Sequence, residues 1–210
     1  MNWIEFIFRW QTLIGAVLGG MFALATALIV AYSMRRREVV AAGMIVITNL
    51  TAVRIALEAI NSLPAREGIS ENEFPLWFSD RLVGLYPGLS TLFEASVAQV
   101  MPVDVYLAAH LTLFQRIYSQ IGIMVEKLSV DYDHFREHGK PLRPEDDVIA
   151  DCKLISRHFP MAVKHAECAE EIIGKLVLSH FPTWNKVRYF FHVSEQEKKC
   201  RKMLKMGSSS

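Results

Sequence analysis

Residues 13–32 read LIGAVLGGMFALATALIVAY and contain no charged side chain. As a helix rising about 1.5 Å per residue, this segment is long enough to cross a hydrocarbon core of about 30 Å. Trp3 and Trp10 precede it and Tyr32 ends it, and such aromatic flanks are typical of a membrane-spanning helix. We therefore expect residues 1–37 to be a transmembrane anchor, with the lipid bilayer as a partner.

The charges beside this segment predict its orientation. Arg35, Arg36 and Arg37 follow it directly, whereas the residues before it carry little net positive charge. By the positive-inside rule, the rest of the chain faces the cytoplasm. The alternative is a cleavable signal peptide, because alanines recur at Ala-x-Ala spacing in residues 23–27. A signal core is only about 7–15 residues long and has its positive charges on the other side, which favours the anchor.

Small residues recur at every fourth position of the apolar segment, which places them on one helix face. A ridge of this kind lets a second backbone approach closely, as in GxxxG dimers. It predicts a homo-oligomer that forms through the transmembrane helix, although Gly and Ala are also common in spanning helices for other reasons. The ridge consists of Gly15, Gly19, Ala23, Ala27 and Ala31.

The stretch Arg9-Trp10-Gln11-Thr12-Leu13-Ile14-Gly15-Ala16, followed by an Ala/Leu-rich run and an arginine cluster, resembles the N-termini of small, uncharacterised single-pass proteins of the bacterial inner membrane. The resemblance covers the chain to about residue 40. It implies a location in a bacterial inner membrane and carries no activity with it.

The rest of the chain has the apolar periodicity of helices. Three segments place apolar residues at alternating steps of three and four, the pattern of a helix that packs against other helices. No segment shows sustained strand-like alternation. We expect an all-α chain in which residues 38–182 form a cytoplasmic antiparallel helical bundle. The three seams are Val39, Gly43, Val46, Leu50, Val53, Leu57 and Ile60; Leu107, Leu111, Phe114, Tyr118, Ile121, Val125, Leu128, Tyr132 and Phe135; and Val148, Cys152, Ile155, Phe159, Ala162, Ala166, Ala169, Ile173 and Leu176.

Prolines and glycines mark the expected ends and irregularities of these helices. The first seam should end at Asn61–Pro64, with Gly43 as a candidate bend. Pro160 lies inside the last seam and should kink or split that helix. Two shorter helices are expected over residues 70–86 and 90–100, between the first and second seams.

The C-terminal residues 183–210 carry seven basic residues against two acidic ones, with several aromatic residues beside them. We interpret them as a basic amphipathic tail that can lie on an anionic membrane surface; the alternative is a solvated helix end. Because the whole chain has a net charge of only +1, nucleic acid is not an expected partner. The membrane-surface candidates are Lys198, Lys199, Arg201, Lys202 and Lys205.

Three cysteines, Cys152, Cys168 and Cys200, are sparse and form no CxxC pair, which favours thiols in a reducing compartment over a disulfide framework. Soft and imidazole ligands are concentrated on one expected helix, at Cys152, His158, His165 and Cys168. Of these four, only His165 and Cys168 share a helix face at i and i+3. The alternative to a metal site is that the thiols act as small apolar core residues.

The sequence contains no Walker or dinucleotide loop, HExxH, GxSxG or EF-hand motif. We therefore infer no catalytic activity and no cofactor. The expected function is an interaction or scaffold module with an unknown cytoplasmic protein partner. The alternative is a membrane-tethered, metal-dependent sensor or enzyme that uses the Cys/His cluster around residues 152–168.

Overall fold

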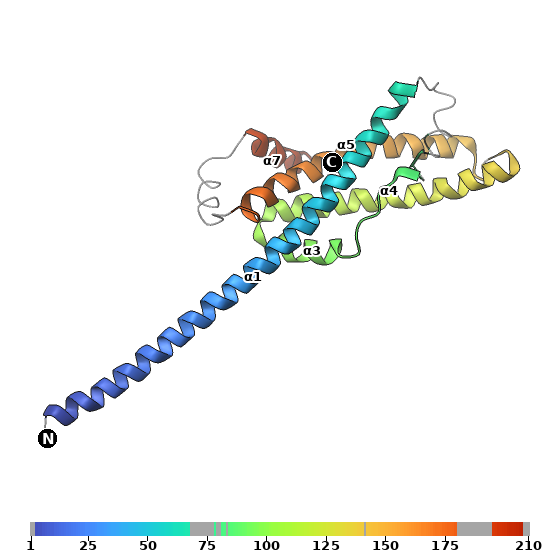
Figure 1. Cartoon of the computed structure of the whole chain (residues 1–210). Coiled ribbons are helices and arrows are strands. Elements are labelled where there is room, and N and C mark those ends of the chain that lie inside the picture. Colours follow the sequence, from blue (N-terminus) through green and yellow to red (C-terminus); the bar gives the residue numbers. More distant parts are fainter. Residues whose placement is uncertain are drawn as a thin grey trace. The chain divides into compact units, whose positions relative to one another are not determined.

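The computed structural model describes residues 3–67, 78, 81–82, 84–140, 142–179 and 195–207. These residues form helices, turns and loops and contain no strand, so the expected all-α class is confirmed. In chain order the elements are α1 (Trp3–Glu67), α3 (Phe93–Val100), the short 3₁₀ helix η1 (Met101–Val103), α4 (Val105–His138), α5 (Glu145–Leu176) and α7 (Glu195–Gly207). Figure 1 labels the five α-helices. The chain divides into two compact units, Met1–Ala41 and Ala42–Ser210.

The first unit is the N-terminal part of α1. Every side chain from Leu13 to Glu38 is exposed, including its Leu, Ile, Val and Phe residues. Within the part of the chain that the structure describes, α1 is the one helix long and apolar enough to cross a membrane, by length and composition, and the candidate segment is Leu13–Ile60. The expected span, residues 13–32, lies at its N-terminal end.

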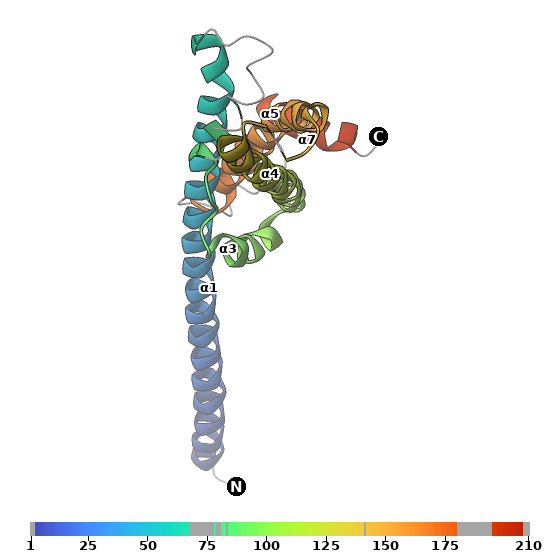
Figure 2. The same ribbon diagram turned by 90° about the vertical axis from the view of Figure 1, so that its right-hand side faces the viewer.

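The second unit is organised around α4 and α5, which run side by side in both Figure 1 and Figure 2. They are antiparallel, since His110 near the start of α4 contacts His165 in the second half of α5. At the start of α4, the side chain of Asp104 accepts a hydrogen bond from the Leu107 N–H at 2.9 Å and so caps the helix. Gly139 ends α4 with a φ of 75°, a conformation that favours glycine.

Most residues of the three predicted seams form the core of this unit; Val39, the first of them, is only partly buried and belongs to the first unit. Val46, Leu50, Val53, Leu57 and Ile60 of α1 are at most 1% exposed, and all nine seam residues of α5 are buried. In α4 the seam is buried from Leu107 to Leu128, and only its last two residues, Tyr132 and Phe135, are partly exposed. The periodicity therefore predicted the inward faces of the three long helices correctly.

Gly43 allows α1 to approach α5 closely. A Cβ atom at this position would lie 2.7 Å from Val177 Cγ1 and 3.3 Å from Ile173 Cγ2. Further along α1, Thr51 donates a hydrogen bond to Glu170 Oε1 at 3.1 Å. Gly43 thus lies within a continuous helix and serves helix packing, a role that the expectation of a bend missed.

Two expected helix boundaries are corrected by the structure. α1 continues past Pro64 and ends at Glu67, within one turn, so the proline removes only one backbone donor near the helix end. α5 is continuous through Pro160, so of the two expected effects, a kink or a split, the split does not occur. Pro160 is exposed, so the carbonyl that loses its donor lies on a side open to water.

Of the two shorter helices, the one expected over residues 90–100 is α3, which begins only at Phe93. α3 begins three residues later than expected, and the Ser90 N–H instead donates a hydrogen bond to Asn49 Oδ1 of α1 at 2.9 Å. Most of the helix expected over residues 70–86 lies outside the described residues.

Candidate functional site

A disulfide between Cys168 and Cys200 attaches α7 to α5. Both cysteines are 5% exposed, and their Cα atoms are 5.9 Å apart, within the range of natural disulfides. The expectation of three thiols is therefore wrong for this pair. The sequence contains no CxxC motif, but packing of α7 on α5 brings together two cysteines separated by 32 positions. Cys152 is buried and lies outside this disulfide.

Two buried histidines contact each other, and one of them lies beside the disulfide. His110 of α4 is 0% exposed and His165 of α5 is 5% exposed. Their Nδ1 atoms are 2.9 Å apart, so one imidazole donates its Nδ1–H and the other accepts with a lone pair.

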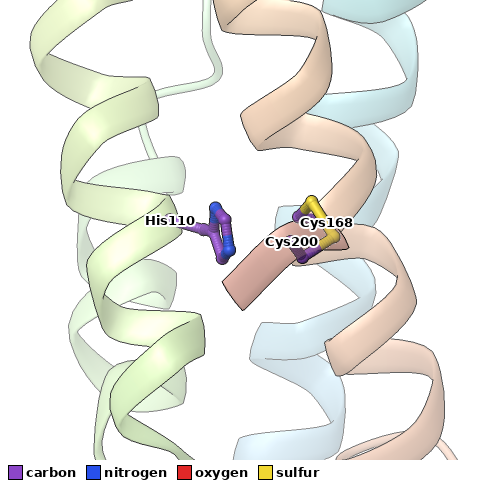
Figure 3. A group of neighbouring side chains, drawn as sticks. All are labelled: His110, Cys168 and Cys200. Carbon is purple, nitrogen blue, oxygen red and sulfur yellow. A yellow bond between two sulfur atoms is a disulfide. The ribbon is translucent and has the colours of Figure 1, made fainter. Parts of the chain in front are cut away.

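His110 also faces the two sulfur atoms, as Figure 3 shows. One of its ring nitrogens and the sulfur atoms of Cys168 and Cys200 all lie within 4.8 Å of one another. His110 Nε2 is buried and has no hydrogen-bond partner among the described residues. A buried polar atom without a partner costs folding free energy, so it calls for a functional explanation.

Burial keeps both imidazoles neutral at physiological pH. It lowers the pKa of His110 to about 4, with an additional contribution from the charge that His165 would carry, and it lowers the pKa of His165 as well. A neutral imidazole has a nitrogen lone pair that can accept a hydrogen bond or bind a metal ion.

An open groove between α5 and α7 leads from the surface to both cysteines. Glu167 and Glu195 line this groove together with Lys164 and Lys199. The cluster of His110, His165, Cys168 and Cys200, which we call the His/Cys cluster, is therefore buried but lies next to a solvent-accessible surface.

The His/Cys cluster contains only two of the four ligands proposed from sequence. His165 and Cys168 belong to it, as their shared helix face suggested. Of the four, only Cys168 has its ligand atom within 4.8 Å of those of His110 and Cys200, and His165 is connected to this group by its contact with His110. His158 is partly exposed, and its Nδ1 lies 2.7 Å from the carbonyl oxygen of Leu154, in its own helix.

His110 and Cys200 were not among the four ligands proposed from sequence, although both occupy inward-facing positions. His110 lies three residues after Leu107 and four before Phe114, directly beside the seam of α4. Cys200 precedes Met203 and Leu204 at i+3 and i+4, the apolar stripe of an otherwise charged helix. Apolar periodicity that included Cys and His would have indicated both residues.

The basic residues of the tail are divided between solvent and the bundle. Lys198, Lys199 and Lys202 are exposed, and Lys198 forms an ion pair with Glu195 at 2.7 Å. The Arg201 guanidinium lies 4.5 Å from the ring centroid of Tyr106 in α4, a cation–π contact. The side chain of Lys205 lies outside the described residues. The part of the tail that forms α7 therefore packs on the bundle through Cys200 and Arg201.

The ridge of small residues is exposed along its whole length in α1. A Cβ atom added at Gly15 or Gly19 would meet no atom within 4 Å. Gly15, Gly19, Ala23, Ala27 and Ala31 therefore leave this face open to a neighbouring helix.

No protein-family model, curated protein or solved structure shows significant similarity to this chain.

Proposed function

We propose that this chain is a single-pass membrane protein of a bacterial inner membrane whose cytoplasmic helical bundle is an interaction or scaffold module. The observation that carries the proposal is the exposure of every side chain between Leu13 and Glu38, most of them apolar. Contiguous apolar surface of this size is rare on soluble proteins. In a bilayer the same helix is well solvated, because all its backbone polar groups bond within it.

The orientation follows from Arg35, Arg36 and Arg37 at one end of the apolar segment. The bacterial inner membrane follows from the resemblance of the first part of the chain. Surface on the bundle remains for a protein partner: Met44 and Ile55 of α1 are 54% and 58% exposed, on the helix whose opposite face forms the core. The exposed Lys198, Lys199 and Lys202 supply a basic surface that can contact anionic lipid.

Membrane topology tests this proposal most directly. Two full-length fusions would carry at the C-terminus either a fluorescent protein that matures only in the cytoplasm or a phosphatase that is active only outside it. We expect membrane-bound protein that resists alkaline extraction, with signal only from the fluorescent fusion. A soluble protein, or activity only from the phosphatase fusion, would contradict the proposal.

A charge-reversal variant tests whether the arginines beside the span determine the orientation. Replacing the three arginines by Glu (R35E, R36E and R37E together) should shift part of the population to the opposite orientation, because these charges border the span. Reversal of Lys198, Lys199 and Lys202, which lie far along the chain from the span, should leave the orientation unchanged.

A further inference from the structure

The His/Cys cluster combines two sulfur atoms and two imidazoles from three helices, α4, α5 and α7. Tetrahedral sites of two thiolates and two imidazoles are typical of Zn²⁺. With Zn–S bonds of about 2.3 Å and Zn–N bonds of about 2.0–2.1 Å, neighbouring ligand atoms in such a site are about 3.3–3.8 Å apart. One ring nitrogen of His110 and the sulfur atoms of Cys168 and Cys200 lie within 4.8 Å of one another, so three ligands are already grouped. The fourth, His165, is in contact with this group through its Nδ1 atom, 2.9 Å from His110 Nδ1.

The compartment provides a second argument. Cytoplasmic thiols are kept reduced, so a buried disulfide is unusual in the bundle of a protein oriented as proposed above. With Cys168 and Cys200 reduced, two buried thiols would lie beside His110, whose Nε2 has no partner among the described residues. A metal ion would bind the two sulfur atoms and give the unpartnered His110 nitrogen a partner at the same time.

We propose that Cys168 and Cys200, when reduced, bind one Zn²⁺ together with His110 and His165, and that the disulfide is the metal-free, oxidised form of the same site. The site goes beyond the scaffold function and makes the attachment of α7 sensitive to the redox state. In either form the cluster holds α7 against α4 and α5.

The conversion between the two forms balances with a dithiol as the reductant. The S–S bond of the protein breaks while one S–S bond forms in the dithiol, and two electrons and two protons pass to the sulfur atoms of Cys168 and Cys200. Zn²⁺ then forms two Zn–S bonds, and the two thiol protons are released to solvent. Both histidines enter as neutral ligands and release no proton. The groove between α5 and α7 provides the route for the dithiol and the ion.

Zinc content of the purified full-length chain in detergent tests this proposal. The chain is reduced with dithiothreitol, desalted anaerobically, mixed with Zn²⁺, desalted again and analysed for metal. We expect about one zinc ion per reduced chain and none in the same chain with its disulfide intact. Co²⁺ in place of Zn²⁺ should give the visible absorption of tetrahedral cobalt bound to thiolate. A reduced chain that binds no zinc, or an oxidised chain that binds it equally well, would overturn the proposal.

Variants assign the ligands. Cys200→Ser and His110→Ala should weaken zinc binding by more than about 100-fold, because even residues that only support a ligand contribute about 10- to 100-fold. Cys152→Ser, a buried cysteine of the same helix outside the cluster, is the matched control and should bind like the parent chain. Undiminished binding by Cys200→Ser would overturn the site, and undiminished binding by His165→Ala would overturn its fourth ligand.

Two features keep the test decisive. The comparison of oxidised and reduced parent chain requires no substitution, so it holds even where a variant fails to fold, and circular dichroism identifies such variants. Because the assay uses purified protein, its result is independent of membrane topology, and failure of this proposal is distinguishable from failure of the proposed function.

Discussion

At the scale of single residues, the same residue type has opposite roles in two helices of the bundle. Gly43 is buried at a helix contact, where a Cβ atom would lie 2.7 Å from Val177 Cγ1. Gly174 in α5 is exposed, and a Cβ atom there would meet no atom within 4 Å. Val177 is β-branched and stiff, so it cannot easily move away from an added methyl group.

Alanine substitutions at these two glycines should therefore change stability in opposite directions. Gly174→Ala should raise the free energy of unfolding by about 0.5–1 kcal/mol, because alanine is the better helix former. Gly43→Ala should lower it by about 1 kcal/mol, since overpacking costs about 1–3 kcal/mol and exceeds the gain in helix propensity. Denaturant unfolding of the full chain in detergent, followed by circular dichroism, measures both. A stabilised Gly43→Ala variant would show that Val177 can move away from the added methyl group.

At the scale of elements, an ion-pair network fixes the turn between α4 and α5. Arg143, in the segment joining the two helices, donates from Nε to Asp131 Oδ2 at 2.7 Å and from Nη1 to Asp151 Oδ2 at 2.8 Å. The Asp131 side chain is only 4% exposed, so its charge depends on this partner. Hydrogen bonds to Asp131 are the largest cause of the raised pKa of Arg143.

Removal of the arginine should destabilise this helical hairpin. Arg143→Met should lower the free energy of unfolding by about 2–3 kcal/mol, because it leaves the Asp131 carboxylate buried without its countercharge; Arg143 is partly exposed, which places the effect at the lower end for buried pairs. Arg157→Met, an exposed arginine of α5, is the control and should change stability by less than about 0.5 kcal/mol. Adding Asp131→Leu to Arg143→Met should restore part of the loss, and no recovery would mean that Asp131 acts by other contacts.

At the scale of the whole molecule, we propose that two chains associate in the membrane through the exposed ridge of α1. Its small residues let two helix backbones approach within van der Waals contact, which is the main attraction between helices in lipid. No atom of the chain lies within 4 Å of a Cβ atom added at Gly15 or Gly19. The residues of the adjacent helix turns are also exposed.

Self-association should therefore be weakened by replacing a glycine on the ridge and not by replacing a glycine on another face of the helix. Gly19→Leu should reduce association between two differently labelled full-length chains, measured by energy transfer in vesicles, because the larger side chain separates the helices. Gly20→Leu is the matched control: the residue is adjacent in sequence, equally exposed and about 100° away around the helix. Equal effects of the two substitutions, or none from Gly19→Leu, would argue against association through this face.

Much of the fold was predictable because helix periodicity is a local property of the sequence. The steps of three and four in Val46–Ile60, Leu107–Leu128 and Val148–Leu176 indicated the buried faces that the structure shows. The helix ends were less predictable, because Pro64 and Pro160 are tolerated where the lost backbone donor lies near a helix end or on the exposed side. Two of the four residues of the His/Cys cluster, His165 and Cys168, were predicted from the sequence.

The sequence by itself determined the elements: an apolar segment without charges, three amphipathic seams and a basic C-terminal helix, each specified by neighbours a few residues apart. Only the tertiary structure decided which side chains meet. Cys168 and Cys200 are 32 positions apart, and His110 and His165 are 55 apart, so no local pattern relates them. They form one cluster because α7 packs on α5 while α4 and α5 run antiparallel, and such contacts depend on how helix faces fit together in three dimensions.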